Sequence, residues 1–500
     1  MNGLRVLFTA APGVAIPAGG TVLPEENLPP SAIYALGAVL EAAGHSCTVL
    51  DPSRFWHDVS TFSALQRAVD GHEVVCVSAN VATWPLAIPL IRALAACRPR
   101  PRIVVGGLHP TYCADHVLAT TEADIVVRGE GERTLPRLLQ ALADEERLEA
   151  IPGLTFRGEH GPASTPDAAP LTPEELDALP PPLWERLPEK VYSFIPVEAS
   201  RGCRFGCTFC SIQHKHNWRP LAVEQVARRV RQGVRALSRV RLRALMFSDD
   251  CFTTDPERVR LIADLLEREA PSTAVAMEGR ATDVLQPSVL EGLARMPIEF
   301  LQIGVECGYD EGLRRVGKGV TVEQVVASAH ALHRGGLQRV VKYSYIVGFP
   351  WEGWNEMART VAFAVSLASR YGNRCQIAWL MVAPGSAIYD TMAARGLVGP
   401  SDFDGPSVEH WELFRRVHPA LDETRAEALR EYAHLLRQGV PWVGALGGVF
   451  EPLARYYRLP DSGHDQPAAM RCGGNASGWG GHTFWGQLPP VLRQDGHGGQ

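Results

Sequence analysis

Short apolar segments alternate with helical segments over the first 142 residues, and this alternation constrains the fold more than any other feature of the chain. The apolar segments are continuous runs of Val, Ile and Leu, which are typical of strands in a parallel sheet buried on both faces. Strands are predicted at Leu4–Thr9, Cys47–Leu50, Val74–Ser78, Ile103–Gly106 and Asp124–Arg128, and helices at Ser31–Ala43, Pro85–Cys97 and Thr134–Leu142. Five such units predict an α/β domain with an open, doubly wound, Rossmann-like sheet, whose ligand would lie beyond the carboxyl ends of the strands.

A second alternation follows a segment rich in proline. The eight prolines between Pro162 and Pro188 predict an extended linker. Beyond it, strands are predicted at Ile195–Ala199, Ala244–Asp249, Ala274–Arg280, Phe300–Val305, Val340–Val347 and Gln376–Val382. Helices are predicted at Ala222–Leu237, Pro256–Glu269, Val289–Arg295, Val322–Arg334, Asn355–Ser369 and Ala387–Arg395. Six units of this kind predict a partial (β/α)6 TIM-like barrel, with the chemistry on the loops that follow the strands.

These patterns divide the chain into five parts. A first domain covers residues 1–150, a linker 151–190 and the partial barrel 191–400. A small helical segment is predicted over 401–460, with its helices at 421–458. The tail over 461–500 is rich in Gly, His and Pro and is predicted to be disordered.

Composition excludes several classes of partner. The net charge of −6 over 500 residues gives no reason to expect nucleic acid or an anionic membrane surface. Two uncharged stretches, Val6–Pro24 and Val74–Ile91, are interrupted by proline and by Gly or polar residues, so neither reads as a signal peptide or a membrane span. Eleven scattered cysteines do not form a disulfide framework, and we therefore expect a cytoplasmic protein.

Three of those cysteines lie in the segment RGCRFGCTFC, directly after the first predicted strand of the barrel. Cys203, Cys207 and Cys210 have the spacing CxxxCxxC, and the neighbouring glycines allow the backbone to bring the three sulfurs together. Structural zinc would need a fourth ligand, which His214 or His216 could provide. A [4Fe–4S] cluster held by three thiolates would instead leave one iron open to a further ligand. The spacing leaves both metal centres possible.

With an aromatic residue at Phe209, the cysteine motif ahead of six β/α units resembles the radical S-adenosylmethionine (SAM) enzymes. The resemblance covers roughly residues 191–395. It implies that Cys203, Cys207 and Cys210 hold a [4Fe–4S] cluster whose open iron binds SAM. It also implies cleavage of SAM to a 5′-deoxyadenosyl radical, and an electron donor such as flavodoxin or ferredoxin.

Further positions match SAM contacts of that family. They are Phe209, Ser248, Asp249, Asp250, Arg280, Glu306 and Gly348. The acidic pair could instead cap a helix, although Asp255 could already serve that cap. Glu306 would need a partner if buried, and Lys318 or Arg280 could provide one, so an ordinary ion pair is the alternative. Gly348 could equally be a turn glycine.

The first domain shows no GxGxxG after its first strand, which argues against NAD or FAD. Its segments VSANVAT, VVGGLHPTYCADH and DIVVRGEGERT instead resemble the cobalamin-binding domain found before many radical SAM barrels, over about residues 1–145. The residues implied in contact with cobalamin are Ser78, Gly106, Gly107, His109, Thr111, Gly129, Glu130, Gly131 and Thr134. The motif DxHxxG is missing, and His72 in DGHEVV reads as a surface residue, so no histidine is expected beneath cobalt. A domain that has lost cobalamin is the alternative.

The two resemblances together imply a cobalamin-dependent radical SAM enzyme similar to the class B methyltransferases. Such an enzyme would transfer a methyl group to an unactivated carbon of a small-molecule or natural-product intermediate, through the 5′-deoxyadenosyl radical and methylcobalamin. The cofactors carry the chemistry, and no catalytic side chain is assigned. A radical SAM cyclase or rearrangement enzyme without net methylation is one alternative, and a zinc-stabilised cobalamin-binding sensor is another.

Overall fold

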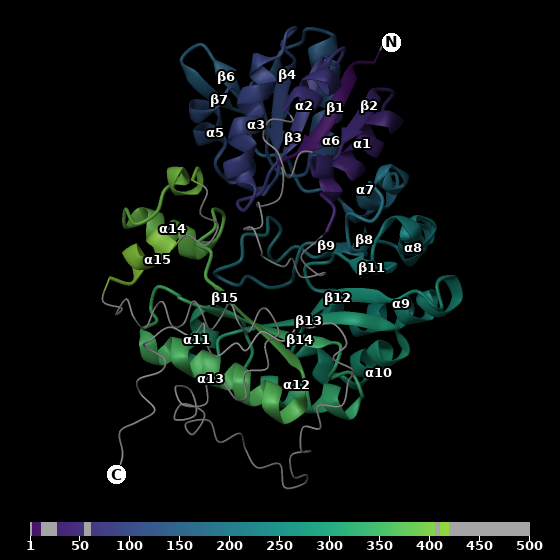
Figure 1. Ribbon diagram of the computed structural model, residues 1–500, viewed down its shortest axis with the longest axis vertical. Helices are drawn as coiled ribbons and strands as arrows, with labels where there is room; N and C mark the ends of the chain where they lie inside the picture. Colours follow the sequence, from purple (N-terminus) through teal and green to yellow (C-terminus); the bar gives the residue numbers. More distant parts are fainter. Residues whose placement is uncertain (1–2, 12–27, 55–61, 406–410, 420–500) are drawn as a thin grey trace, which may run out of the picture. The chain divides into compact units, whose positions relative to one another are not determined.

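The computed structural model describes residues 3–11, 28–54, 62–405 and 411–419 (Figure 1). The predicted helices over 421–458 and the tail from 461 lie outside these residues. The described residues form two compact units. The first unit contains Met1–Glu278, Glu291–Phe300 and Met381–Leu413, and the second contains Gly279–Leu290, Leu301–Leu380 and the chain from Phe414. This division differs from the one predicted from the sequence, because the predicted linker and the start of the predicted barrel both belong to the first unit.

The first unit contains a seven-stranded sheet with the order β2-β1-β3-β4-β5-β6-β7. Its strands are β1 (Arg5–Ala10), β2 (Ser46–Leu50), β3 (Val74–Ser78), β4 (Arg102–Gly106), β5 (Ile125–Val127), β6 (Leu154–Gly158) and β7 (Gly161–Ser164). Strands β1 to β5 pair in parallel, within a residue or two of the predicted bounds. The strand order reverses between β1 and β3, and in open α/β sheets such a switch point forms the ligand crevice.

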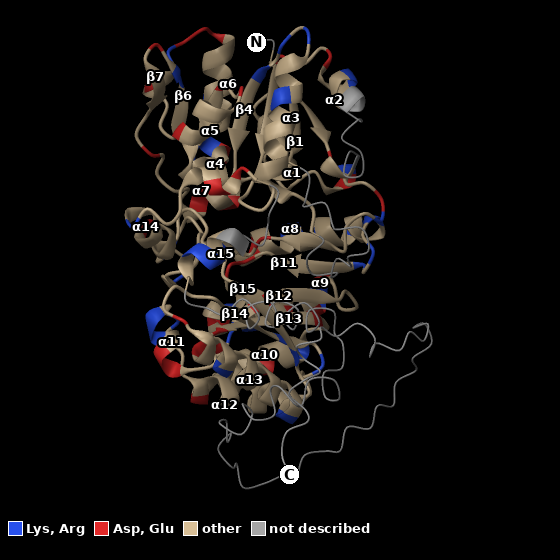
Figure 2. Cartoon of the chain, turned by 60° about the vertical axis from the view of Figure 1, so that its left-hand side comes forward, with Lys and Arg blue, Asp and Glu red and all other residues tan. Residues whose placement is uncertain are grey.

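Helices flank this sheet (Figure 1). They are α1 (Ser31–Ala42), α2 (Phe62–Val69), α3 (Trp84–Ala96), α4 (Leu108–Tyr112), α5 (Ala114–Thr120) and α6 (Gly131–Ala143). Helix α1 contacts α6, and α2 contacts α3. Figure 2 draws β1 and β4 largely in tan, the colour of uncharged residues, as expected for strands buried on both faces. The prediction missed α2, α4 and α5, which are all eight residues long or shorter.

The prediction that this segment is an extended linker is wrong, because two strands and a helix form within it. Strand β6 pairs antiparallel with β5 and with β7 at the edge of the first sheet. Helix α7 (Pro173–Ala178) follows, with a capping box between Thr172 and Glu175. Pro162 lies in the last strand at the sheet edge and Pro173 at the first position of a helix, and both positions tolerate a missing N–H. Tyr34 and Tyr192 both donate to the buried Asp51, which fixes the end of this segment to the first domain.

The second sheet has six strands in the order β15-β14-β13-β12-β11-β8, and it is open rather than closed into a barrel. Its strands are β8 (Phe194–Val197), β11 (Ala244–Phe247), β12 (Val275–Arg280), β13 (Ile298–Glu306), β14 (Val341–Val347) and β15 (Arg374–Trp379). Strands β8, β11 and β12 pair in parallel, as do β13, β14 and β15. All six predicted strands are confirmed. The boundary between the two compact units runs through β12 and β13.

Six of the helices of this part match predicted ones closely, whereas α11 and α15 were not predicted. They are α8 (Val223–Ala236), α9 (Pro256–Glu269), α10 (Pro287–Arg295), α11 (Asp310–Arg315), α12 (Val322–Arg334), α13 (Trp354–Tyr371), α14 (Ala387–Ala394) and α15 (Trp411–Val417). Asp255 caps α9 and Thr321 caps α12, which explains why these two helices begin where the sequence predicts. In the part of the chain that the structure describes, no helix combines the length and apolar composition needed to cross a bilayer.

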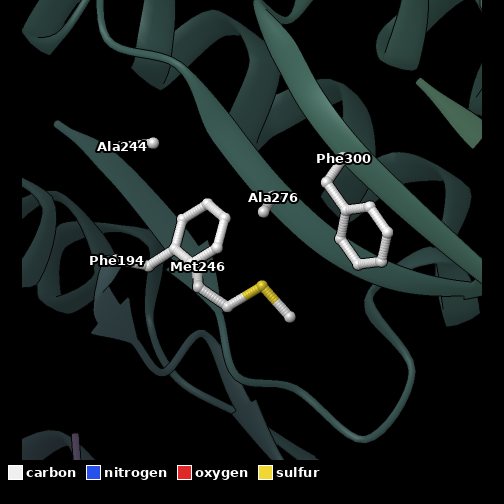
Figure 3. Packing of buried hydrophobic residues seen from close by; sticks show 5 residues of the cluster. All are labelled: Phe194, Ala244, Met246, Ala276 and Phe300. Carbon is white, nitrogen blue, oxygen red and sulfur yellow. The ribbon is translucent and has the colours of Figure 1, made fainter. Parts of the chain in front are cut away.

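Apolar side chains of neighbouring strands form the core between β8 and the start of β13 in the first unit (Figure 3). The cluster contains Phe194, Ala244, Met246, Ala276 and Phe300, each no more than 5% exposed. Large and small residues alternate across the strands, so that the two phenylalanine rings and the methionine occupy space left by the alanines. This packing joins β8, β11, β12 and the start of β13, and the cysteine loop follows β8 along the chain.

We expect Leu245→Ala in β11 to lower the free energy of unfolding by about 2–5 kcal/mol, because Leu245 is fully buried and the substitution leaves a cavity. The matched control is Leu242→Ala, three residues earlier, where the side chain is 39% exposed and the expected loss is under about 1 kcal/mol. Chemical unfolding followed by circular dichroism measures both. Equal losses would contradict this description of the core.

Candidate functional site

A cavity of about 260 Å³ lies at the carboxyl end of the first sheet. Strands β1, β3 and β4 provide part of its wall, so it coincides with the switch point of the sheet. Its described lining is mostly apolar and contains no histidine. The lining residues are Phe8, Ala32, Ile33, Ala35, Leu36, Cys76, Val77, Ser78, Val104, Gly106, Gly107, Leu108, Thr111, Val127, Gly129, Glu130, Gly131, Glu132, Leu135, Arg201 and Gln213.

Seven of the nine residues implied in contact with cobalamin line this cavity, and His109 and Thr134 do not. His109 is 1% exposed and stacks on Trp84, with 4.7 Å between ring centroids, while its edge meets Phe403. Burial lowers the pKa of His109 to about 4, so the ring is neutral at ordinary pH. The hydroxyl of Thr134 donates to the carbonyl oxygen of Pro152 at 3.3 Å. The side chains of both residues therefore serve packing inside the first unit.

At two positions of the lining, the backbone conformation and the neighbouring atoms require glycine. Gly107 has φ of 106°, and a Cβ there would collide with the backbone carbonyl of Ala79. Gly129 has φ of 84°, and a Cβ there would lie 2.9 Å from Nε2 of Gln213. The glycines suit close approach of a ligand, as predicted, but their first role is to let backbone segments and the Gln213 side chain meet.

The cysteine loop, residues 202–218, closes on a short stem in which β9 (Ser200–Arg201) pairs antiparallel with β10 (Arg219–Pro220). The backbone N–H of Cys203 donates to the carbonyl of His214 at 3.1 Å. Gly202 has φ of 83°, and a side chain there would collide with the carbonyl of Asn217. Cys203 is buried, whereas Cys207 and Cys210 are half-buried. The backbone thus sets the path of the loop that carries the three thiols.

Three cysteine thiols on one loop are the donors that an iron–sulfur cluster takes. Among the described residues, no three His, Cys, Asp or Glu side chains converge closely enough to hold one metal ion. A zinc ion requires its ligands to meet within about 2.3 Å of one centre. In a cubane cluster each thiolate binds a different iron, so the sulfurs stand farther apart. His214 lies 3.3 Å from the Glu130 carboxylate, and His216 packs against Gly206.

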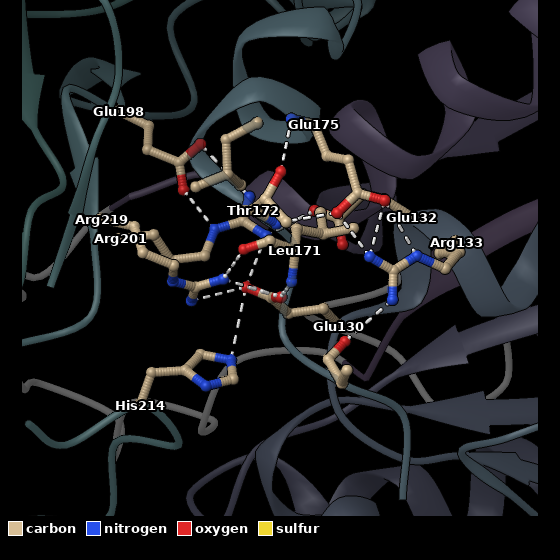
Figure 4. A network of polar contacts seen from close by, with 12 residues as sticks. Glu130, Glu132, Arg133, Leu171, Thr172, Glu175, Glu198, Arg201, His214 and Arg219 are labelled. Carbon is tan, nitrogen blue, oxygen red and sulfur yellow. Dashed lines mark hydrogen bonds and ion pairs between the residues drawn. The ribbon is translucent and has the colours of Figure 1, made fainter. Parts of the chain in front are cut away.

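Glu130 lies at the start of α6, beside the cavity, and its carboxylate binds the base of the cysteine loop (Figure 4). Arg219 in β10 donates two hydrogen bonds to it, of 2.9 and 3.0 Å, and Arg201 in β9 donates a third of 3.1 Å. His214 Nε2 lies 3.3 Å from the same carboxylate, and the backbone N–H of Leu171 donates at 2.6 Å. Both strands of the stem, and the loop itself, are therefore bound to one carboxylate. A hydrogen bond from Glu130 to a corrin amide would have to compete with these contacts.

The charge of Glu130 is strongly stabilised. Burial alone would raise its pKa, but the adjacent imidazole of His214, the hydrogen bonds from Arg219 and Leu171 and the charge of Arg201 outweigh burial and hold the pKa well below its ordinary value. Arg201 also pairs with Glu132, another residue of the cavity lining, at 3.0 Å. The side chains of Glu130 and Glu132 are only 8% and 10% exposed, so these are buried charges held by buried partners.

The predicted acidic pair after β11 divides into two different environments. Asp249 is 4% exposed; its carboxylate accepts from the N–H of Ala199 at 3.1 Å and is hydrogen-bonded to the hydroxyl of Ser200. Ser248 and Asp250 are exposed, and Asp250 accepts from the N–H of Gly202 in the cysteine loop. The carboxylate of Asp249 is thus committed to the strand that leads into the loop. Asp255 caps α9, so the acidic pair is not needed for that purpose.

The second unit contains Arg280, Glu306 and Gly348. Glu306 is 6% exposed and pairs with Lys318 at 2.6 Å, which identifies the partner that burial requires. It has φ of 76° and lies at a register shift between β13 and β14, so strain is stored at this residue. Arg280 donates to Thr282 at 3.1 Å. Gly348 has φ of 91°, and its N–H donates to Glu352 at 2.7 Å.

Two family models match the chain. The model described as the B12 binding domain matches residues 20–139, and the model described as the Radical SAM superfamily matches residues 197–364. The first segment contains most of the cavity lining, and the second contains the cysteine loop. The chain belongs to the cobalamin-dependent radical SAM enzymes. A [4Fe–4S] cluster, SAM and cobalamin are the cofactors that these two domains imply.

Named relatives differ in their reactions. The chain is 28% identical over 331 residues to an uncharacterized methyltransferase of Pyrococcus horikoshii, covering 64% of the chain and 67% of the relative. It is 26% identical over 330 residues to an anaerobic magnesium-protoporphyrin IX monomethyl ester cyclase of Synechocystis sp., covering 63% of the chain and 64% of the relative. The alignments therefore span about two thirds of the curated relatives. Because the two relatives are named for different reactions, the comparison does not decide which reaction this radical SAM enzyme catalyses.

A solved structure shares the fold of this cobalamin-dependent radical SAM enzyme. It is the radical S-adenosylmethionine methyltransferase TsrM from Kitasatospora setae, with a TM-score of 0.62 and 16% identity. The match covers 79% of this chain and 75% of TsrM. At this identity the likeness concerns the fold alone.

Several residues of the site were not found from the sequence. Arg201 and Arg219 in the stem bind Glu130, Arg201 also binds Glu132, and Gln213 reaches the cavity from the cysteine loop. Arginines immediately before and shortly after a cysteine motif were the available signal, but their acidic partners lie 71 and 89 positions away. Glu352 was also not found from the sequence, and its carboxylate accepts a hydrogen bond from the backbone N–H of Gly348.

The buried Asp249 generates a prediction on pH. Burial raises its pKa to about 7, although hydrogen bonds from Ser200 and Ala199 act in the opposite direction. A carboxyl group whose pKa is higher in the folded chain adds stability at low pH, and this stability is lost as the pH rises toward the folded pKa. We therefore expect the melting temperature of the protein to fall between pH 5 and 8 more than that of Asp249→Asn, which can keep both hydrogen bonds.

The control for this comparison is Asp264→Asn on the exposed side of α9, where hydrogen bonding to Arg295 lowers the pKa of Asp264. That variant should keep the pH slope of the parent protein between pH 5 and 8. Thermal melts at four or five pH values decide the matter. The same slope in the parent and in Asp249→Asn would contradict the raised pKa.

Proposed function

We propose that this radical SAM enzyme transfers a methyl group to an unactivated carbon of a small molecule. One observation carries the proposal: in the first unit, residues of the cysteine loop and of its stem line the cavity at the carboxyl end of the first sheet. Arg201 and Gln213 line the cavity, and they lie two residues before Cys203 and three residues after Cys210. A methyl carrier and a radical generator would therefore be held side by side by neighbouring residues.

When bound, cobalamin would supply the methyl group and the cluster would supply the electron that cleaves SAM. The chain's own residues position these groups. Cys203, Cys207 and Cys210 provide three thiolates and leave a fourth ligand position free of protein. The apolar lining of the cavity, with Ser78 and Thr111 as its hydroxyl groups, suits a large flat ligand and restricts the access of water. No step requires an acid or base from the protein.

For the SAM contacts, the burial pattern favours some of the sequence-predicted residues. Ser248 and Asp250 are exposed beside the cysteine loop, and we propose them as SAM contacts together with Phe209. Asp249 is assigned a supporting role, because its carboxylate is occupied by Ala199 and Ser200. In the second unit, Arg280, Glu306 and Gly348 remain proposed SAM contacts.

Cyclisation or rearrangement without methylation is the second candidate. The similarity to a magnesium-protoporphyrin IX monomethyl ester cyclase favours it, with an identity only slightly below that to the methyltransferase. Both reactions need a reductant, for which a small electron-transfer protein such as flavodoxin or ferredoxin is the proposed source. A reducing cytoplasm is the proposed location, because the three cysteines must stay reduced until the cluster is assembled.

The products of SAM distinguish the two reactions. Methyl donation to cobalamin releases S-adenosylhomocysteine, and reductive cleavage at the cluster releases 5′-deoxyadenosine. We expect the reconstituted enzyme, with reductant and SAM under anaerobic conditions, to form both. Replacement of Cys203, Cys207 or Cys210 by Ala should abolish 5′-deoxyadenosine, because no electron then reaches the sulfonium. Liquid chromatography with mass spectrometry measures both products.

The matched control is Cys97→Ala, which removes a buried thiol far from the cysteine motif in the sequence and should leave both products unchanged. Formation of 5′-deoxyadenosine with no S-adenosylhomocysteine would contradict methyl transfer and favour the cyclase or rearrangement reaction. Absence of 5′-deoxyadenosine from the parent enzyme would contradict both candidates.

A further inference from the structure

We propose that Glu130 is a positioning residue that couples cobalamin binding in the cavity to retention of the cluster by the cysteine loop. The proposal requires that the chain binds both cofactors, and it does not depend on whether the enzyme transfers a methyl group. It concerns contacts within the first unit only, since Glu130, its partners and the three cysteines all belong to that unit.

The backbone around Glu130 belongs to the cavity. Gly129, Glu130, Gly131 and Glu132 are consecutive lining residues, and they include the first turn of α6. A ligand that fills the cavity restrains this peptide, and with it the carboxylate of Glu130. The first cofactor to bind loses free energy because it orders these four residues. The second cofactor then binds residues that are already ordered, so its binding carries no such entropic loss.

The side chain of Glu130 contacts the cysteine loop and its stem. Its carboxylate binds Arg201 and Arg219, which face each other across the two-stranded stem, and it lies 3.3 Å from His214. The carbonyl of His214 accepts from the N–H of Cys203, so the carboxylate is connected to the first cluster ligand through a single residue. When the stem is fixed, the loop has fewer conformations in which the three sulfurs are apart.

The loop also reaches the cavity in the opposite direction. Arg201 and Gln213 line it, and Gln213 Nε2 occupies the space left open by the missing side chain of Gly129. Once a cluster fixes the cysteines, these two side chains are held in place for the ligand of the cavity. Coupling between two binding sites is reciprocal, so each cofactor should strengthen the binding of the other by the same factor.

The experiment measures that factor without SAM, substrate or turnover. Hydroxocobalamin is titrated by absorbance into the full chain with the reconstituted cluster and into the same chain freed of iron. In parallel, the rate of iron loss to a chelator is measured with and without saturating hydroxocobalamin. For the parent protein we expect cobalamin affinity to rise at least about fivefold when the cluster is present, and iron loss to slow by a comparable factor.

In Glu130→Gln the coupling factor should fall to about one, even if each cofactor still binds. The matched control is Glu257→Gln, which makes the same substitution in an exposed pair with Arg260 and should keep the parent factor. Arg219→Lys keeps the charge but loses the paired hydrogen bonds, so its factor should lie between those of the parent and Glu130→Gln. Circular dichroism checks that each variant is folded.

Three results would overturn the proposal. They are a parent protein that binds the two cofactors independently, a parent protein that binds no hydroxocobalamin, and a folded Glu130→Gln variant that keeps the parent factor. If Glu130→Gln does not fold, Arg219→Lys decides, and an unchanged factor in that variant counts against the proposal. Because no SAM is added, failure of the proposed methyl transfer would leave these measurements unaffected, and the two failures are distinguishable.

Discussion

One buried carboxylate, that of Glu130, connects the parts of the first unit that matter for function. Burying an isolated carboxylate is costly, and the cost is offset here by two arginines, a histidine and a backbone N–H that all point at it. Removing one partner of such a buried pair typically costs about 3–5 kcal/mol. The stem of the cysteine loop and the first turn of α6 therefore stay together as long as this carboxylate is charged, and its lowered pKa keeps it charged.

The geometry of the cysteine loop follows from the backbone as much as from the ion pairs. Gly202 adopts a conformation with positive φ that brings it against Asn217, and the N–H of Cys203 binds the carbonyl of His214. Both contacts are made by backbone atoms, so the path of the loop is set by the main chain and not by the thiols.

Much of this arrangement could be predicted from the sequence, because the deciding signals are local. The first sheet followed from runs of Val and Ile, and helices α9 and α12 begin where Asp255 and Thr321 cap them. The proline-rich segment was predicted wrongly because proline density does not reveal that Pro162 lies in the last strand of a sheet and Pro173 opens a helix. Position in the chain, not composition, decides what a proline does.

The polar contacts were harder to predict, since they join residues distant in the sequence. His109 follows a strand next to two glycines, a typical place for a ligand contact, but Trp84 and Phe403 bury it. Glu130 was predicted to face the corrin, whereas its carboxylate binds Arg219, 89 positions later in the chain. No local pattern could have indicated that partner, because a fold must first bring the two segments together.

The central claim is that three thiolates leave one iron of the cluster open for SAM. Electron paramagnetic resonance of the reduced, reconstituted protein tests it directly, with spectra recorded before and after SAM is added. Coordination of SAM to an iron changes the electronic structure of the cluster, so we expect a shifted signal from the parent protein. An unchanged signal, at SAM concentrations at which equilibrium dialysis shows SAM bound, would contradict the account.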